Sequence, residues 1–179
     1  PEQLEHDLVR AALELLEIDG GIEITSIADI PSEGTGLGSS SSFLVGLLNA
    51  LYAFKGQHKS AEELARQACE IEIDTLGKPI GKQDQYIAAY GGLQYIQFNP
   101  DETVFVDPII FSQKVKAGLE KHLLLFYTGL TRKSSHILKE QKQKINQGTH
   151  LTLRKMKWLA QEVRDALRRN SLEEFGELL

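Results

Sequence analysis

The segment PSEGTGLGSSSS, residues 31–42, decides how the rest of this chain is interpreted. Residues 22–30 before it are rich in isoleucine and predict a strand, and a long apolar run up to Phe54 after it predicts a helix. Glycines allow a sharp backbone turn, and the first N–H groups of a helix attract anions because they have no partners within the helix. The sequence therefore predicts an anion-binding loop at a strand-to-helix junction, with an ordinary serine-capped loop as the alternative.

Composition narrows the class of protein. The 179 residues have the apolar, charged and aromatic fractions of an ordinary soluble globular protein, and a net charge of -5 argues against nucleic-acid binding. Cys69 is the single cysteine, which excludes disulfides within the chain and predicts a reducing compartment. No apolar run reaches the length of a membrane span. We therefore expect a cytoplasmic location and no membrane partner.

Three helices are predicted around the glycine and serine segment. The first spans residues 2–17, where apolar side chains recur on one face at helical spacing: Leu4, Leu8, Ala11 and Leu15. The second spans residues 43–54 and is apolar at nearly every position, so we expect it to be covered on all sides. The third begins at Ser60, which is predicted to form a capping box with Glu63.

Glu72 is predicted to point inward from the third helix. It falls on the apolar stripe of that helix when a step of about 100° per residue is continued, whereas Glu70 and Asp74 rotate away. A glutamate is rarely buried without a partner, and the usual partner is a basic side chain or a metal ion. Both partners remain open for Glu72 on this reasoning.

Asp84 lies in the first turn of a predicted short helix, residues 83–90, which Gly91 and Gly92 end. It shares a face with Ile87, so we expect its side chain to point inward as well. The alternative is simple helix capping, which is what most aspartates at the start of a helix do.

The second half of the chain predicts a β-hairpin, followed by a buried strand. Residues 93–98 and 104–106 flank a turn and alternate as antiparallel strands do. Residues 122–127 predict the buried strand. The loop that follows it contains Arg132 and Lys133, which either bind an anion or lie in solvent.

The remainder of the chain predicts helices. Residues 137–145 form a short charged helix, and an apolar stripe marks a longer one over residues 156–167. Ser171 is predicted to cap a third helix that runs to the last residue.

Three segments carry a resemblance to a known family. PSEGTGLGSSSS resembles the phosphate-binding motif of the GHMP small-molecule kinases, and GKPIGKQD with AAYGG, residues 77–92, is similar to the segment of that family that ends in a catalytic aspartate. YTGLTR, residues 127–132, looks like the branch that contains heptose 7-phosphate kinases and fucose kinases. The resemblance covers most of the chain.

The resemblance implies an α+β fold, truncated at both ends. Residues 1–92 would be the end of a ribosomal-S5-like N-terminal ATP-binding domain, and residues 93–179 would be part of a ferredoxin-like C-terminal domain. Two family motifs, an Arg/Gly-rich substrate motif near the start and a glycine-rich motif near the end, are not visible in this sequence. We therefore expect the chain to be the central part of a longer kinase.

The resemblance also assigns roles to residues. Asp84 would be the catalytic base, Ser40 and Glu72 would hold Mg²⁺, and Gly129 and Arg132 would contact the sugar substrate. The loop around the ATP phosphates would be formed by Gly34, Gly36, Leu37, Gly38, Ser39, Ser40, Ser41 and Ser42.

The expected function is transfer of a phosphoryl group from Mg-ATP to a hydroxyl of a sugar or sugar phosphate, with the anomeric hydroxyl of heptose 7-phosphate as the first choice. One alternative is another GHMP kinase, acting on fucose, galactose or mevalonate. A second alternative is a non-catalytic protein of the same fold that binds nucleotide or sugar. The expected partner is a small molecule, and a homodimer is allowed.

Overall fold

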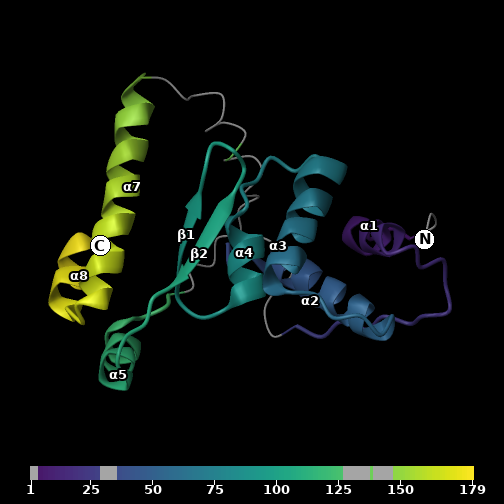
Figure 1. The fold of residues 1–179 in the computed structure, drawn as a ribbon, viewed down its shortest axis with the longest axis horizontal. Helices are drawn as coiled ribbons and strands as arrows, with labels where there is room; N and C mark the ends of the chain where they lie inside the picture. Colours follow the sequence, from purple (N-terminus) through teal and green to yellow (C-terminus); the bar gives the residue numbers. More distant parts are fainter. Residues whose placement is uncertain (1–3, 29–35, 127–137, 139–146) are drawn as a thin grey trace. The chain divides into compact units, whose positions relative to one another are not determined.

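The computed structural model describes residues 4–28, 36–126, 138 and 147–179 (Figure 1). The chain divides into two compact units, Pro1–Gly91 with Leu130–Glu140 and Gly92–Gly129 with Gln141–Leu179, and each unit is described by itself. None of the helices in the described residues combines the length and the hydropathy that a membrane span requires.

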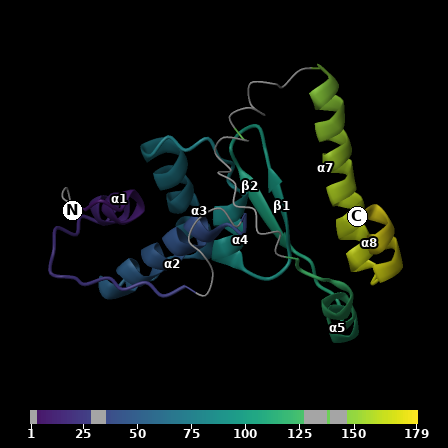
Figure 2. The same ribbon diagram turned by 180° about the vertical axis from the view of Figure 1, so that it is seen from behind.

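The first unit is helical over its described residues. Its elements are α1 (Asp7–Leu15), α2 (Ser39–Phe54), α3 (Ala61–Cys69), the π-helix η1 (Glu70–Thr75) and α4 (Gln83–Tyr90). Helix α2 contacts α1, α3 and α4, and these four helices are seen together in Figure 2. The predicted capping box of Ser60 and Glu63 begins α3 and is confirmed.

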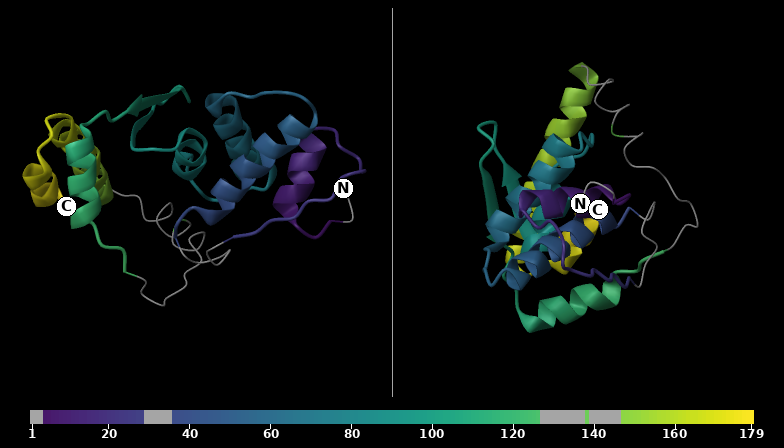
Figure 3. Two further views of the ribbon diagram at one scale, coloured as in Figure 1. Left: turned by 90° about the horizontal axis from the view of Figure 1, so that it is seen from below. Right: turned by 90° about the vertical axis from the view of Figure 1, so that its right-hand side faces the viewer.

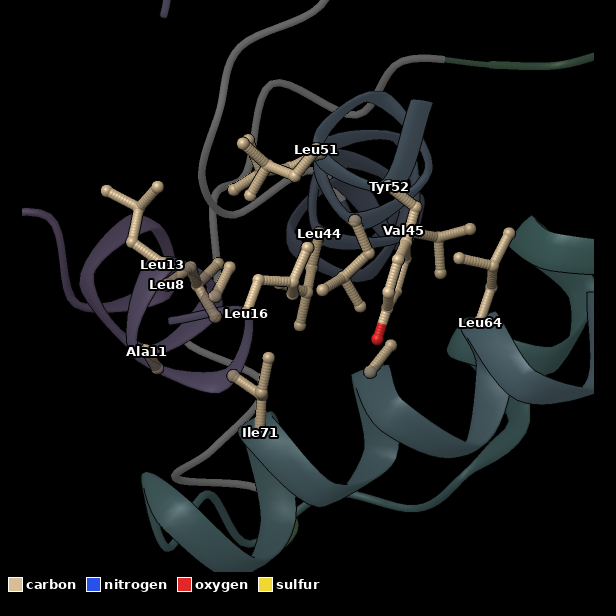
Figure 4. Packing of buried hydrophobic residues seen from close by; sticks show 14 of the residues in the cluster. Leu8, Ala11, Leu13, Leu16, Leu44, Val45, Leu51, Tyr52, Leu64 and Ile71 are labelled. Carbon is tan, nitrogen blue, oxygen red and sulfur yellow. The ribbon is translucent and has the colours of Figure 1, made fainter. Parts of the chain in front are cut away.

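Leucines of α2 form the centre of the apolar core. Leu44, Leu48 and Leu51 are fully or almost fully buried and belong to one apolar cluster. Figure 4 shows Leu44 between α1 on one side and α3 with η1 on the other. Each buried leucine contributes roughly 1.5–3 kcal/mol through apolar surface removed from water. Helix α2 is therefore held firmly by its neighbours, and its N-terminus has a fixed position within the unit.

Two details of the predicted helices are wrong. Helix α1 begins at Asp7 rather than at residue 2, and Leu4 and Leu15 are exposed, because the buried face contains the neighbouring Leu13 and Leu16 instead. Helix α2 is not covered on all sides, since Phe54 is 61% exposed and lies on a side that the described helices do not pack against.

Residues 22–28 do not form the predicted strand. They are extended but have no strand beside them among the described residues, and Ile27 is 92% exposed. A strand is defined by hydrogen bonds to a neighbouring strand, so a β-branched sequence alone does not produce one. Residues 29 and 30 lie outside the described residues.

The described residues of the second unit form a β-hairpin and three helices. Strands β1 (Gln94–Phe98) and β2 (Val104–Pro108) pair antiparallel, as predicted. Helix α5 (Gln113–His122) contacts α8 (Leu172–Leu178), which packs against α7 (Gln147–Arg168), and Figure 3 shows these helices side by side (Figure 3).

Polar contacts join α7 to the hairpin, and a serine caps the N-terminus of α8. Arg168 forms an ion pair with Asp107 of β2 at 2.6 Å, and the guanidinium of Arg164 lies 4.6 Å from the ring centroid of Tyr95 in β1. Ser171 accepts a hydrogen bond from the backbone N–H of Glu174, which confirms its predicted capping role.

The predicted buried strand over residues 122–127 is wrong for the described part. His122 is the last residue of α5, and residues 123–126 are exposed and have no strand partner among the described residues. The apolar run is therefore a poor indicator of burial here, because no described element covers it. Residue 127 and the predicted helix over 137–145, apart from Leu138, lie outside the described residues.

The packing of α2 leads to a stability prediction. Replacing the fully buried Leu48 by alanine should lower the free energy of unfolding by about 2–5 kcal/mol, because it leaves a cavity in the core. Phe54→Ala, an exposed position on the same helix, should cost less than about 1 kcal/mol. Urea denaturation of the two variants tests this, and equal losses would contradict the core described above.

Candidate active site

The N-terminus of α2 is formed by the glycines of the predicted anion-binding loop. Gly36 and Gly38 have φ angles of +70° and +68°, a conformation that glycine adopts without strain. Gly38 is the N-cap residue, and its carbonyl accepts a hydrogen bond from the N–H of Ser42 at 2.9 Å. Glycine has no side chain that could cap the helix, and the positive end of a helix dipole favours an anion.

Glu72 is buried beneath this helix terminus. Glu72 is 0% exposed, which agrees with the inward orientation predicted from the sequence. It belongs to the π-helix η1, which continues α3. Both Ile71 and Glu72 in this π-helix are buried, Ile71 in the apolar core and Glu72 against α2. π-helical turns are rare and occur frequently at functional sites.

Four side chains donate hydrogen bonds to the Glu72 carboxylate. Oε1 accepts from Ser40 Oγ at 2.8 Å and from Lys78 Nζ at 2.9 Å. Oε2 accepts from Ser41 Oγ at 2.6 Å and from Gln85 Nε2 at 2.6 Å. One carboxylate therefore joins the first turn of α2, the turn after η1 and the first turn of α4.

These contacts keep Glu72 ionised. Burial by itself raises the pKa of the carboxyl, but hydrogen bonds from Ser41, Lys78 and Ser40, together with the charge of Lys78, outweigh it and hold the pKa below its ordinary value of 4.5. The group is consequently a buried anion at neutral pH.

Asp84 lies beside Gly38, at the start of α2. A Cβ atom added to Gly38 would be 3.4 Å from both Cγ and Oδ2 of Asp84. The expectation that Asp84 points inward is wrong, because its side chain is exposed. In the first turn of a helix the side chain leans back toward the N-terminus, and here that direction leads to Gly38.

Helix α4 is fixed against α3 by two tyrosines. The hydroxyls of Tyr86 and Tyr90 donate to Oε1 and Oε2 of Glu62, each at 2.9 Å, and the two rings stack with their centroids 6.3 Å apart. Burial, followed by the neighbouring Glu62, raises the pKa of Tyr86 well above its ordinary value. Because both ends of α4 are anchored, Asp84 and Gln85 have a defined position relative to α3.

The structure brings together most of the residues that the sequence assigned to the site. Ser40, Ser41 and Glu72 are in direct contact, and Asp84 lies at Gly38. Gly34, Gly129 and Arg132 lie outside the described residues, so their predicted roles stay predictions.

Two residues of this cluster were missed. Gln85 is fully buried, and Lys78 supplies the basic partner that was one of the two open alternatives for Glu72. A signal for Lys78 did exist in the sequence, since it follows Glu72 by six residues in a glycine-bounded turn. Gln85 gave no such signal, because a glutamine one residue after a helical aspartate is common on exposed surfaces.

The donor set at Glu72 fits a hard cation. Ser40 Oγ and Glu72 Oε1 are oxygen atoms 2.8 Å apart, and Mg²⁺ is usually bound by one or two protein oxygens together with water and phosphate. Among the described residues, no three His, Cys, Asp or Glu side chains gather as they would in a site made from protein ligands alone. Ser40 and Glu72 together could therefore supply part of the ligand shell of such a cation.

A surface pocket of about 440 Å³ lies elsewhere in the first unit. Its polar lining includes Ser42, Asn49, His58 and Lys59. Among the described residues that were assigned to the site, Ser42 alone borders it. The cluster around Glu72 and Asp84 is therefore separate from this pocket.

Residues 7–92 match the family described as GHMP kinases N terminal domain. The match includes Gly38, Ser40, Glu72 and Asp84. This part of the chain therefore belongs to the GHMP kinase family.

Two known proteins are similar over much of the chain. The D-glycero-alpha-D-manno-heptose 7-phosphate kinase of Campylobacter jejuni is 35% identical over 118 residues, which are 66% of this chain and 34% of that protein. The L-fucokinase/L-fucose-1-P guanylyltransferase of Bacteroides fragilis is 33% identical over 181 residues, which are 93% of this chain and 18% of that protein. The chain thus spans only a part of either relative.

Solved structures share the fold. A D-glycero-D-manno-heptose 1-phosphate kinase from Bacteroides thetaiotaomicron superposes with a TM-score of 0.72 at 29% identity, covering 100% of this chain and 55% of that one. A putative sugar kinase from Campylobacter jejuni gives a TM-score of 0.69 at 26% identity, covering 96% of this chain and 50% of that one. The chain therefore has the fold of about half a GHMP kinase, mostly helical with a small two-stranded sheet.

The lowered pKa of Glu72 predicts a pH dependence of stability. Glu72→Gln should cost about 1–3 kcal/mol near neutral pH, because it removes the ion pair with Lys78 and weakens the hydrogen bonds of the buried Ser41 and Gln85. Since the folded-state pKa lies below 4.5, this advantage of the wild type is complete above that pH and is lost as the pH falls toward the folded-state pKa. Denaturation curves of both proteins between neutral pH and acid test this, and a difference independent of pH would contradict an ionised Glu72.

Proposed function

We propose that the protein is an ATP-dependent kinase that phosphorylates a hydroxyl of a sugar or sugar phosphate, with the anomeric hydroxyl of heptose 7-phosphate as the acceptor. One observation carries the proposal: a buried carboxylate, Glu72, and an exposed one, Asp84, meet at the glycine-capped N-terminus of α2. The similarity to heptose and fucose kinases supports the choice of acceptor.

The N-terminus of α2 would hold the ATP phosphates. The turn at Gly36 and Gly38 allows the backbone to approach a ligand closely, and the helix dipole favours negative charge there. The packing of Leu44 and Leu48 keeps this terminus in place before the ligand arrives. Preorganised donors of this kind stabilise charge on a transferred phosphoryl group without moving during the reaction.

Ser40 and Glu72 would hold Mg²⁺, as their oxygen atoms at α2 allow. When bound, the metal supplies positive charge that neutralises the phosphate oxygens. Ser41 and Gln85 fix the other carboxylate oxygen, so the orientation of Glu72 is set by the protein.

Asp84 would accept the proton of the attacking hydroxyl. Its exposed position is suited to this role, because a base must reach a ligand that enters from solvent. Its place beside Gly38 would bring it close to phosphates held at the start of α2. Gly129 and Arg132 would contact the sugar.

In the whole protein, residues 1–92 would belong to a ribosomal-S5-like domain. Residues 93–179 would belong to a ferredoxin-like domain.

Asp84→Asn should lower the turnover number by about a hundredfold or more, because the amide no longer accepts the proton, while the affinity for ATP changes little. Asp74→Asn is the matched control, since Asp74 is also exposed and lies in η1. Steady-state kinetics and nucleotide titration of both variants test the assignment, and a normal turnover number for Asp84→Asn would remove Asp84 from the mechanism.

The proposed activity is tested with the complete protein and a set of acceptors. Heptose 7-phosphate, fucose, galactose and mevalonate are supplied with Mg-ATP, and ADP release is measured for each. We expect the fastest release with heptose 7-phosphate. Release with another acceptor would correct the substrate, whereas tight nucleotide binding without release for any acceptor would favour a binding protein.

A further inference from the structure

The carboxylate of Glu72 is already fully occupied. A carboxylate offers about four acceptor positions, and each oxygen of Glu72 accepts two hydrogen bonds. A cation that binds directly to Oε1 must therefore replace one of the present donors. On Oε1 these donors are Ser40 Oγ and Lys78 Nζ.

Lys78 is the donor that can leave. Its side chain is 32% exposed, so the ammonium can exchange the carboxylate for water. Ser40, the other donor to Oε1, is exposed as well, so it is the positive charge of Lys78 that sets it apart. Ser40 can stay at the site, because a lone pair of its hydroxyl oxygen can bind a cation while the hydroxyl keeps its proton. Lys78 is also a cation itself and lies 2.9 Å from the atom in question.

We propose that Lys78 is the resident cation of Glu72 and that a divalent cation takes its place, so the ammonium and the metal exclude each other at Oε1. This inference rests on the proposed metal role of Ser40 and Glu72. In the free protein the ammonium balances the buried negative charge, which prevents the cost of an unpaired ion. The Lys78 ammonium also weakens the binding of a divalent cation that arrives without a nucleotide.

The inference is tested by metal binding alone, without ATP or sugar. Mn²⁺ is titrated into the full protein, and the free ion is measured by electron paramagnetic resonance. Lys78→Met should bind Mn²⁺ about tenfold more tightly than the wild type, because a competing positive charge is removed from the site. Lys59→Met is the matched control: Lys59 also forms an ion pair, with Glu63 at 3.1 Å, but that pair is not part of the Glu72 cluster.

Two further variants test whether the gain in Mn²⁺ affinity arises from the charge of Lys78 beside Glu72. They are Lys78→Arg and the double variant that combines Lys78→Met with Glu72→Gln. The arginine keeps a positive charge and should leave Mn²⁺ affinity within about twofold of the wild type, and the double variant should lose the gain. Unchanged affinity in Lys78→Met, or an equal gain in Lys59→Met, would overturn the inference. A failure of this kind leaves the kinase proposal intact, because ADP release is measured separately.

A measurement on the wild type covers the case in which Lys78→Met does not fold. Acetylation of Lys78 by an amine reagent is quantified by mass spectrometry with and without saturating Mn²⁺, and Lys59 serves as the internal reference. We expect Lys78 to be acetylated several-fold faster with Mn²⁺, because the ammonium has been released from Glu72. An unchanged rate ratio would overturn the inference.

Discussion

The hydrogen bonding of one buried carboxylate fixes the geometry on which the candidate site depends. Glu72 is surrounded by Ser40 and Ser41 at the start of α2, Lys78 in a turn, and Gln85 at the start of α4. A buried anion is stabilised by a charged partner and by hydrogen bonds, so Glu72 favours the folded arrangement in which these three segments meet. The same requirement places Asp84 next to Gly38, since Asp84 directly precedes Gln85.

The apolar core supplies the rigidity that this polar cluster needs. Leu44, Leu48 and Leu51 hold α2 against α1 and α3, and the Glu62 contacts of Tyr86 and Tyr90 hold α4 against α3. Each of these attachments acts on a helix whose N-terminal end contributes to the site. Because the ends are fixed by packing, the polar groups are in place before a ligand arrives, which is the arrangement that favours electrostatic catalysis.

The sequence predicted the local features of the fold better than the long-range ones. The capping box at Ser60, the helix over residues 83–90 and the hairpin follow from short patterns, and the structure has all three. The strands expected over residues 22–30 and 122–127 required partners that a pattern of apolar residues does not specify. For the site, the burial of Glu72 followed from helical periodicity, but its contact with Gln85 depends on how α3 and α4 pack, which no spacing along the chain contains.

The π-helix joins two environments within one peptide unit. Ile71 faces the leucines of α2 and α1, and the next residue, Glu72, faces the serines of α2. A change in core volume that displaces Ile71 would carry the Glu72 backbone with it and alter the angle at which its carboxylate meets the serines. Substitutions among the apolar residues around Ile71 would thereby change the hydrogen-bond geometry of Glu72 without touching it directly.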